Sequence, residues 1–327
     1  MRARNGWSQP ILSMENFACL LSYFEIDDPF FPSLIGSILA APEKYYRSFL
    51  IPKRKGGQRR ITCPYPSLGS IQKVIFQKTL RSQEVHFASY AFSKNRNAIM
   101  HASNHLNGEE LLTVDIKDFF SNITRQMVFG VFHSIDETRQ IANFLSHICC
   151  LNGAIPQGAC TSPALSNLIF RRFDYRFSQL ADRLNLRYSR YADDLAFSGN
   201  RVPRDLPSLI SKILSDKNFQ LNPEKIRLKI KRSKKIVTGV SISSGVMKAP
   251  KEFKRALRAQ IYELEKNVDN VSRAPIFDPF IYERVLGRLN YVLQIEPDNE
   301  YANKKKKIIS EQHQNFLKLA FLSAKQG

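Results

Sequence analysis

Two adjacent acids, Asp193 and Asp194, are the residues of this sequence whose type and spacing most clearly indicate chemistry. They interrupt a strand-like stretch, 186–198, and have apolar and aromatic residues on both sides. Like charges placed side by side repel each other, so such a pair usually needs a counter-cation. For hard oxygen ligands the usual cation is Mg²⁺. The alternative is a solvated hairpin turn, because Asp is a common turn residue.

A third acid, Asp115, lies near the end of a short apolar stretch, 111–116, which is typical of a strand. If this strand lies beside the hairpin with Asp193 and Asp194 in one antiparallel sheet, three carboxylates converge. Three oxygen ligands without His or Cys suit a pair of Mg²⁺ ions about 4 Å apart, which activates an attacking oxygen and neutralises a leaving phosphate oxygen in nucleotidyl transfer. Asp118 lies past the strand, and we interpret it as an acid at the entry of the next helix.

The elements that must position these acids are indicated by apolar periodicity and by turn residues. Helical spacing of apolar residues predicts helices at 68–83, 123–135, 162–184 and 206–214, and from 250 onward. Turn residues predict a basic hairpin at 52–60, an ordered loop at 152–158, the hairpin at 186–198, and a second hairpin with a strand at 235–242 and a turn at 243–245. This order predicts an α+β fold, with a mixed middle flanked by mostly helical ends.

Composition and charge limit the class of protein. The 327 residues suffice for two or three domains, and 43% hydrophobic with 24% charged residues is typical of a soluble globular chain. The 49 Lys and Arg against 29 Asp and Glu indicate a polyanionic partner, either nucleic acid or an anionic membrane surface. No apolar run approaches the roughly 18 residues of a membrane span, so we expect no membrane attachment. The five cysteines show no metal-ligand spacing and fit a reducing cytoplasm.

Several motifs make the chain resemble reverse transcriptases. Three occur in the order and spacing of that family's palm motifs: Asp115-Ile116-Lys117-Asp118-Phe119-Phe120, Pro156-Gln157-Gly158 and Tyr191-Ala192-Asp193-Asp194. The basic stretch at 52–60, Leu-Asn-Pro-Glu-Lys at 221–225 and Gly-Arg-Leu-Asn-Tyr at 287–291 resemble the family's fingers, lysine and thumb segments.

Two shorter stretches make the chain resemble bacterial retron reverse transcriptases in particular. Asn97-Ala98-Ile99-Met100-His101 is similar to the retron N-A-x-x-H signature, and Val237-Thr238-Gly239 is similar to its V-T-G signature. The resemblance covers roughly residues 50–295. One departure is Cys160, where many relatives have proline. This change makes the loop less rigid but removes no expected ligand.

The resemblance implies a right-hand polymerase architecture with fingers, an antiparallel-sheet palm and a helical thumb. We therefore expect an N-terminal helical extension at 1–50, fingers at 51–110, and a palm at 111–248 with a fingers-side insertion around 123–155. Residues 249–327 are expected to form the helical thumb and an RNA-binding C-terminal region.

The resemblance also assigns roles at the site. It implies that Asp115 and Asp193 are the main ligands of two Mg²⁺ ions, with Asp194 a weaker ligand or a structural acid. Arg59 and Lys53 would bind the triphosphate of the incoming dNTP, which suits a fork donor and a point charge. The alternative for these two cations is a solvated basic hairpin.

For four further residues the resemblance implies a functional role, and each also has a structural interpretation. Phe120 occupies the sugar-gate position that excludes a ribose 2′-OH, although the ring could equally be core. Gln157 would contact the nucleotide, or be a turn residue. Lys225 matches the lysine proposed to protonate the departing pyrophosphate, or is an ordinary surface lysine. His101 could contact RNA or phosphate, although a lone His is more often structural.

Basic residues are concentrated late in the chain. Between 224 and 258 there are twelve Lys or Arg against two acids. A single charge run is usually a solvated face. Next to a predicted active site, it instead predicts a track for template, primer and RNA. The residues expected to bind RNA there are Lys231, Arg232, Lys234, Lys235, Lys251, Lys254 and Arg255.

Taken as a family member, the chain is expected to bind a cognate retron noncoding RNA and to prime from a 2′-OH within it. Its product would be RNA-linked single-stranded DNA (msDNA), and a separate effector protein would act with it in antiphage defence. The alternatives are another bacterial reverse transcriptase, of group II intron or diversity-generating type, and a non-catalytic RNA-binding protein with a polymerase fold. A general basic nucleic-acid binder leaves the order of the motifs unexplained.

Overall fold

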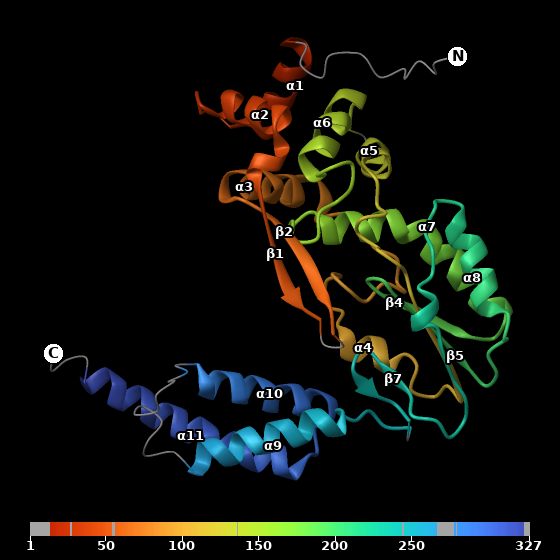
Figure 1. Ribbon diagram of the computed structural model, residues 1–327, viewed down its shortest axis with the longest axis vertical. Helices are drawn as coiled ribbons and strands as arrows, with labels where there is room; N and C mark the ends of the chain where they lie inside the picture. The colour runs from red at the N-terminus through yellow and green to blue at the C-terminus, as the bar shows by residue number, and fades with distance from the viewer. Residues whose placement is uncertain are drawn as a thin grey trace.

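The computed structural model describes residues 14–26, 28–53, 56–135, 137–243, 245–266, 278 and 280–323. Within these residues the chain forms a helical body at one end, a mixed body around a four-stranded sheet in the middle, and three long helices at the other end (Figure 1). None of the helices in the described ranges is long and apolar enough to cross a membrane.

The helical body combines the first part of the chain with two helices that come later in the sequence. Its helices are α1 (Met14–Phe24), α2 (Phe31–Ala40), α3 (Pro66–Ile75), α5 (Arg125–Ser134) and α6 (Arg139–Cys149), with short turns η1 (Pro42–Tyr45) and η2 (Phe76–Leu80). α6 packs against the other four helices because most of its apolar side chains, among them Phe144 and Leu145, are buried. The segment expected as a fingers-side insertion therefore packs with this body.

A long hairpin leaves this body and points toward the three C-terminal helices (Figure 1). Its strands are β1 (Tyr46–Pro52) and β2 (Gln58–Pro64), in antiparallel register from end to end. The turn contains Gly56 at φ +90° and Gly57 at φ +79°, backbone conformations that side chains other than glycine rarely adopt. The predicted basic hairpin is present, with strands that begin earlier and end later than 52–60.

The central sheet is antiparallel throughout, with strand order β4-β5-β3-β6. Its strands are β3 (Glu110–Asp115), β4 (Arg187–Tyr191), β5 (Asp194–Gly199) and β6 (Arg227–Lys229). Alternate residues of β3 and β5 face opposite sides. Leu112 and Phe197 join the core under α7 (Ser162–Arg183) and α8 (Leu206–Ser215), while Leu111 and Ala196 join a second core with α4 (Ala98–Ser103).

That second core continues into the three C-terminal helices, α9 (Lys251–Lys266), α10 (Ile281–Ile295) and α11 (Glu300–Ser323). Apolar residues at helical spacing, such as Leu257 and Ile261 on α9, face Leu289 and Val292 on α10. A short hairpin, β7 (Ile236–Val237) with β8 (Val240–Ser241), connects this core to α4.

The α+β fold predicted from the sequence is confirmed, but two local predictions are not. The expected strand at 235–242 reverses within itself, because Thr238 (φ +43°) and Gly239 (φ +84°) make a tight turn. The backbones of Ser241 and Lys248 then exchange two hydrogen bonds of 2.9 Å across the turn expected at 243–245, of which Ser244 lies outside the described residues. Asp118 lies at φ +48° in the connection after β3, and the next helix begins later, at α5.

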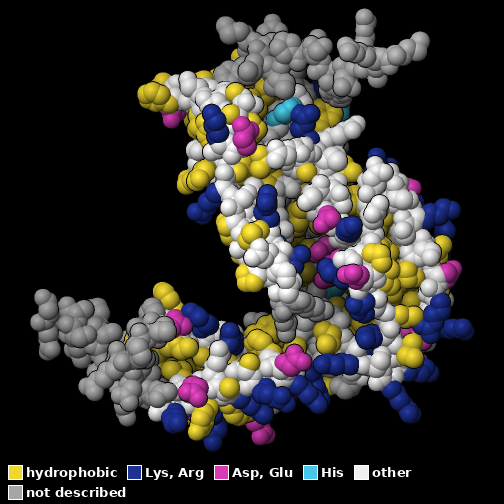
Figure 2. All heavy atoms as spheres, viewed as in Figure 1, with side chains coloured by type: hydrophobic (Ala, Val, Ile, Leu, Met, Phe, Trp, Pro, Cys, Tyr) yellow, Lys and Arg dark blue, Asp and Glu magenta, His cyan; other side chains and the backbone are white. Residues whose placement is uncertain are grey.

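Figure 2 shows an open hollow between the β1–β2 hairpin and the three C-terminal helices. Acidic side chains gather on the central wall beside the hollow, and Lys and Arg gather along the lower margin of the view, over α9 and the adjoining end of the middle body. The domain boundaries given above remain predictions.

Candidate active site

The three predicted acids lie at one end of the central sheet. The register of β3 with β5 pairs Asp115 with Asp194. The N–H of Ile116 donates a hydrogen bond of 3.0 Å to the carbonyl of Asp193. Ala192, at φ +56°, turns the chain between β4 and β5. Strand pairing thus brings Asp115 to the tip of a hairpin that is distant in sequence.

Burial and charge distinguish the three carboxylates. Asp115 is buried, Asp193 is half-buried and Asp194 is exposed. Burial raises the pKa of Asp193 above its ordinary value, and the charge of Asp115 raises it further. A backbone hydrogen bond and the positive charges of Lys225 and Arg59 act in the opposite direction. Asp115 and Asp193 are therefore a repelling pair that two cations partly neutralise.

Lys225 is positioned by the backbone beside β3. The N–H of Asn222 donates to the carbonyl of Asp115 at 2.8 Å, and the Asn222 side chain accepts from the N–H of Glu224 at the start of η3 (Pro223–Lys225). The Lys225 ammonium then lies 2.7 Å from Asp115 Oδ2. Partial burial lowers the pKa of Lys225, but the hydrogen bond to Asp115 and the nearby acid charges raise it above its ordinary value. A charged proton donor is thus held at the acids.

The donor set fits a divalent cation in chemical type. Asp115 and Asp193 offer hard oxygen atoms. Burial raises the pKa of Asp193, and the charge of Asp115 raises it further, a repulsion that a divalent cation relieves. In the part of the chain that the structure describes, no group of three or more His, Cys, Asp or Glu is arranged to hold a metal ion. Asp115 and Asp193 lie close enough for the charge of Asp115 to raise the pKa of Asp193, and Asp194 is exposed beside them.

The loop that contains Gln157 is fastened to β2. The N–H of Thr62 donates to the carbonyl of Gln157 at 2.9 Å. Gly158 follows at φ +141°, and a Cβ there would lie 2.8 Å from the carbonyl oxygen of Thr62. Glycine is required at this position by both its backbone conformation and the lack of space. The Gln157 side chain is half-buried.

The two cations predicted to bind a triphosphate both lie on the β1–β2 hairpin. Arg59, on β2, lies near enough to Asp193 for its charge to lower the pKa of that acid. Lys53 is exposed just beyond β1, where its N–H donates to the carbonyl of Gly57 at 2.9 Å. The structure therefore brings Arg59 to the acids and leaves Lys53 at the hairpin tip.

Phe120 is half-buried and combines features of both predicted roles. Its ring packs against the main core, with its centroid 5.3 Å from that of Phe119. The centroid of the exposed Phe92 ring lies 6.5 Å away. One part of the Phe120 ring is thus held by the core while another part remains accessible, five residues after Asp115.

The two short stretches that resemble retron signatures contact each other. The hydroxyl of Thr238 donates to the carbonyl of Ala98 at 2.8 Å and lies 3.4 Å from His101 Nδ1. The ring centroids of His101 and Tyr191 are 5.8 Å apart. His101 is buried, and burial lowers its pKa to about 4. These contacts support the structural alternative for His101, because its ring does not reach the surface.

The seven cations predicted to bind RNA differ in how accessible their side chains are. Lys231, which is 73% exposed, forms an ion pair of 3.0 Å with Glu109. Lys235 is buried. Lys254 on α9 forms an ion pair of 2.8 Å with Glu296, which directly follows α10. The other predicted residues are exposed: Arg232, Lys234, Lys251 and Arg255.

Sequence reasoning missed a buried ion pair behind the acid hairpin. Arg190 is fully buried and donates to both carboxylate oxygens of Asp174, at 2.8 and 2.7 Å. A third guanidinium bond, of 3.1 Å, goes to the carbonyl of Ala192, directly before Asp193. The pair therefore holds the hairpin tip from behind. The signal for it was Asp174, an acid at a buried position of α7 close to Phe173 and Phe177.

Comparisons with known proteins agree with this geometry. A family model described as "Reverse transcriptase (RNA-dependent DNA polymerase)" matches residues 51–253. The chain is 32% identical over 223 residues to the Retron Ec86 reverse transcriptase of Escherichia coli, covering 67% of this chain and 70% of the relative.

Two relatives from Myxococcus xanthus are also similar. The Retron Mx162 reverse transcriptase is 30% identical over 257 residues, covering 68% of this chain and 53% of the relative. The Retron Mx65 reverse transcriptase is 28% identical over 275 residues, covering 78% of this chain and 62% of the relative. The chain therefore spans about half of the Mx162 relative and somewhat under two thirds of the Mx65 relative.

Proposed function

The chain belongs to the reverse transcriptase family of RNA-dependent DNA polymerases, and within it to the retron reverse transcriptases. From this premise we propose that it copies part of a cognate structured noncoding RNA into DNA. In this proposal, synthesis starts from a 2′-OH within the RNA, and the product is RNA-linked single-stranded DNA. The observation that carries the proposal is the meeting of Asp115, Asp193 and the Lys225 ammonium at one end of the sheet.

The metal-binding residues in the proposal are Asp115 and Asp193, with Asp194 as a weaker ligand or a structural acid. Two bound Mg²⁺ ions would supply the positive charge that activates an attacking hydroxyl and stabilises a leaving phosphate oxygen. The chain's own contribution is to hold two repelling carboxylates together. Arg190 does so indirectly by fixing the turn at Ala192.

The proton needed by the leaving group is supplied by Lys225. A lysine ammonium is protonated at neutral pH, and the Lys225 side chain is 56% exposed, so it can turn from Asp115 toward the substrate. The attacking hydroxyl gives its proton to water, its oxygen forms a bond to the α-phosphorus of the dNTP, and the bond from that phosphorus to pyrophosphate breaks. The ammonium then gives its proton to the departing pyrophosphate oxygen.

Binding and selection of the nucleotide are assigned to four residues. The Arg59 guanidinium and the Lys53 ammonium hold the triphosphate by charge-assisted hydrogen bonds. Gln157 contacts the nucleotide from a loop that is fastened to β2. The accessible part of Phe120 excludes a ribose 2′-OH and thereby favours deoxynucleotides.

RNA binding is assigned to the exposed cations near the start of the C-terminal helices: Lys231, Arg232, Lys234, Lys251 and Arg255. Lys235 and Lys254 are left out of this surface because one is buried and the other is bound by Glu296. His101 is left out because it is buried. The proposal extends to cytoplasmic action with a separate effector in antiphage defence, for which family membership is the support.

The test of polymerase function is the double substitution Asp193→Asn with Asp194→Asn. Mg²⁺-dependent DNA synthesis on an RNA template should fall to background, while the dissociation constant for RNA should change by less than about threefold. Asp205→Asn, an exposed acid at the start of α8, is the matched control and should retain activity. Retained synthesis in the double variant would contradict the metal assignment.

The test of the priming step is to sequence nucleic acid that co-purifies with the protein. RNA joined to DNA through a 2′ linkage supports the retron reaction. DNA product without such a linkage would leave polymerase activity standing and remove the proposed priming from an RNA 2′-OH.

A further inference from the structure

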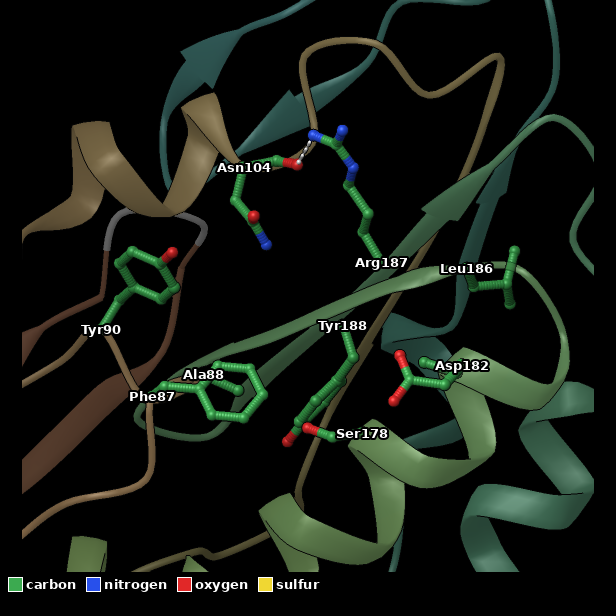
Figure 3. Close-up of a pocket in the computed structure, with 10 residues that line it drawn as sticks. Phe87, Ala88, Tyr90, Asn104, Ser178, Asp182, Leu186, Arg187 and Tyr188 are labelled. Atoms are coloured by element: carbon green, nitrogen blue, oxygen red, sulfur yellow. Dashed lines mark hydrogen bonds between the residues drawn. The ribbon is translucent and has the colours of Figure 1, made fainter.

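A pocket of about 220 Å³ lies at the β4 edge of the central sheet, outside the candidate active site. Four parts of the chain converge on it in Figure 3: the segment before α4, the end of α4, α7 and β4. The residues important here are Phe87, Tyr90, Asn104, Asp182, Arg187 and Tyr188. Sites for drug-sized ligands occupy roughly 300–1,000 Å³, so this pocket suits a single ring-sized group.

One wall of the pocket is aromatic. Phe87 is 67% exposed, so its ring is accessible to a ligand. Tyr90 is half-buried beside it, and its N–H donates to the carbonyl of Arg190 at 2.8 Å. Tyr188 is buried, and its hydroxyl donates to Asp174 at 2.7 Å. The wall is therefore fixed in place and offers an exposed ring on which a flat group can stack.

The pocket also has polar groups. In Figure 3 the Asp182 carboxylate extends from α7 beside Tyr188, and the Asn104 carboxamide extends from the end of α4 on the side of Tyr90. The Asp182 side chain is exposed and the Asn104 side chain is half-buried. The Arg187 guanidinium donates to the backbone carbonyl of Asn104 at 3.2 Å and remains exposed. The pocket thus offers a carboxylate acceptor, an amide and a cation.

The edge of β4 adds two backbone groups. The N–H of Arg190 donates to the carbonyl of Ala88 at 2.8 Å, and the carbonyl of Arg190 accepts from the N–H of Tyr90 at 2.8 Å. Both backbone groups of Arg190 therefore face away from β5. Because backbone groups of alternate residues point the same way along a strand, the N–H and C=O of Tyr188 also face away from β5, toward the pocket. An extended peptide could pair with them, and this is the rival occupant.

We propose that the pocket binds one unpaired nucleobase of an RNA partner, stacked on Phe87 with its exocyclic amino group donating to Asp182. Stacking on aromatic rings and hydrogen bonding of base edges are the usual modes of single-stranded RNA recognition. Arg187 is placed for the adjoining phosphate, and the net charge of +20 favours a polyanion over a peptide. Uracil lacks an amino group and binds more weakly than adenine, cytosine or guanine. RNA as the partner rests on the proposed function.

The experiment places a fluorescent reporter in the pocket. Phe87→Trp is introduced in a Trp7→Phe background, because Trp7 is the single native tryptophan. AMP and CMP should quench the new indole by stacking, with UMP requiring about tenfold higher concentration. Adding Asp182→Ala should remove the preference for AMP and CMP over UMP. The control reporter is Phe30→Trp in the same background, because Phe30 is 78% exposed and lies outside the pocket.

Equal quenching of both reporters, quenching without base preference, or no quenching at position 87 would each overturn the proposal. No quenching at position 87 is the result expected if the pocket is instead occupied by a protein segment paired with β4. The same variants are assayed for extension of an oligo(dT) primer on a poly(A) RNA template. Primer extension without quenching would contradict base binding in the pocket but not the proposed polymerase function. Quenching without primer extension would contradict the polymerase function and leave the pocket as a base-binding site.

Discussion

The Phe120 ring is half-buried: one part packs against the main core, and the rest is accessible near the candidate active site. If its accessible part excludes the ribose 2′-OH, Phe120→Ala should lower the discrimination between dNTP and rNTP by about tenfold or more. The measurement is the ratio of kcat/KM for dATP and ATP on one template. Phe129→Ala is the control, because Phe129 is also half-buried against the main core but lies on α5. Unchanged sugar discrimination in Phe120→Ala would leave the ring with a packing role only.

We expect His105 to make the stability of the protein depend on pH. It is fully buried between the hydroxyls of Ser198, at 2.7 Å, and Ser189, at 2.6 Å. Burial, with smaller effects from His101 and Arg187, lowers the pKa of His105 from 6.5 to about 3. Between these values the unfolded chain binds a proton that the folded chain does not, so the free energy of unfolding falls as the pH falls. The expected loss between pH 7 and pH 5 is about 2 kcal/mol.

The measurement for His105 is urea denaturation at pH 7 and pH 5. His105→Gln should be less stable than the native chain at pH 7 but should lose less free energy of unfolding on acidification. His133→Gln, an exposed position, is the control and should follow the native pH dependence. An equal loss in His105→Gln would show that other groups cause the acid sensitivity.

At the level of elements, the contact between the Pro-Gln-Gly loop and β2 depends on Gly158. A Cβ there would lie 2.8 Å from Thr62 O and 2.9 Å from Cys63 Sγ, at a φ of +141°. Gly158→Ala should therefore lower the free energy of unfolding by about 1–3 kcal/mol, as measured by chemical denaturation. Gly130→Ala on α5 is the matched control, because nothing lies within 4 Å of its Cβ position. It should be neutral or stabilising by less than about 1 kcal/mol. Equal effects of the two substitutions would contradict the close approach.

Elements whose signals are local were predictable from the sequence, and elements fixed by distant contacts were not. Gly56 and Gly57 predicted the turn of the β1–β2 hairpin, and apolar spacing predicted α7. The reversal at Thr238 was missed because its partner groups belong to Ala98 and His101 on another element.

The candidate active site also combines local features with contacts between distant parts of the chain. The sequence predicted that Asp115 lies at a strand end and that Asp193 and Asp194 lie at a hairpin tip, because both are local features. Their approach depends on the pairing of β3 with β5.

The sequence could not predict that Arg190 pairs with Asp174 behind the hairpin, because that pairing depends on how α7 crosses β4. The Lys225–Asp115 contact was unpredictable for a similar reason: it depends on the backbone hydrogen bond between Asn222 and Asp115.

For the molecule as a whole, charge counting predicted a polyanionic partner but not the surface that binds it. Seven cations were predicted to bind RNA from the sequence, and the structure removes two of them from the free surface. Lys235 is buried near the hairpin β7–β8, and Lys254 holds α9 to α10 through Glu296. Lysine side chains combine long apolar stems with a charged end, so a sequence run of them does not reveal which ones face solvent.

The exposed cations of this run should therefore determine how RNA binding responds to salt. Replacing Lys231, Arg232 and Lys234 with Gln removes up to three phosphate contacts, so the slope of log Kd against log salt should become shallower by about 2. The measurement is fluorescence titration of a labelled RNA hairpin at several salt concentrations. The control replaces Lys44, Lys212 and Lys217, which are also exposed but lie outside the run. A slope that stays unchanged in the first triple variant, or changes equally in both, would show that RNA follows a different surface.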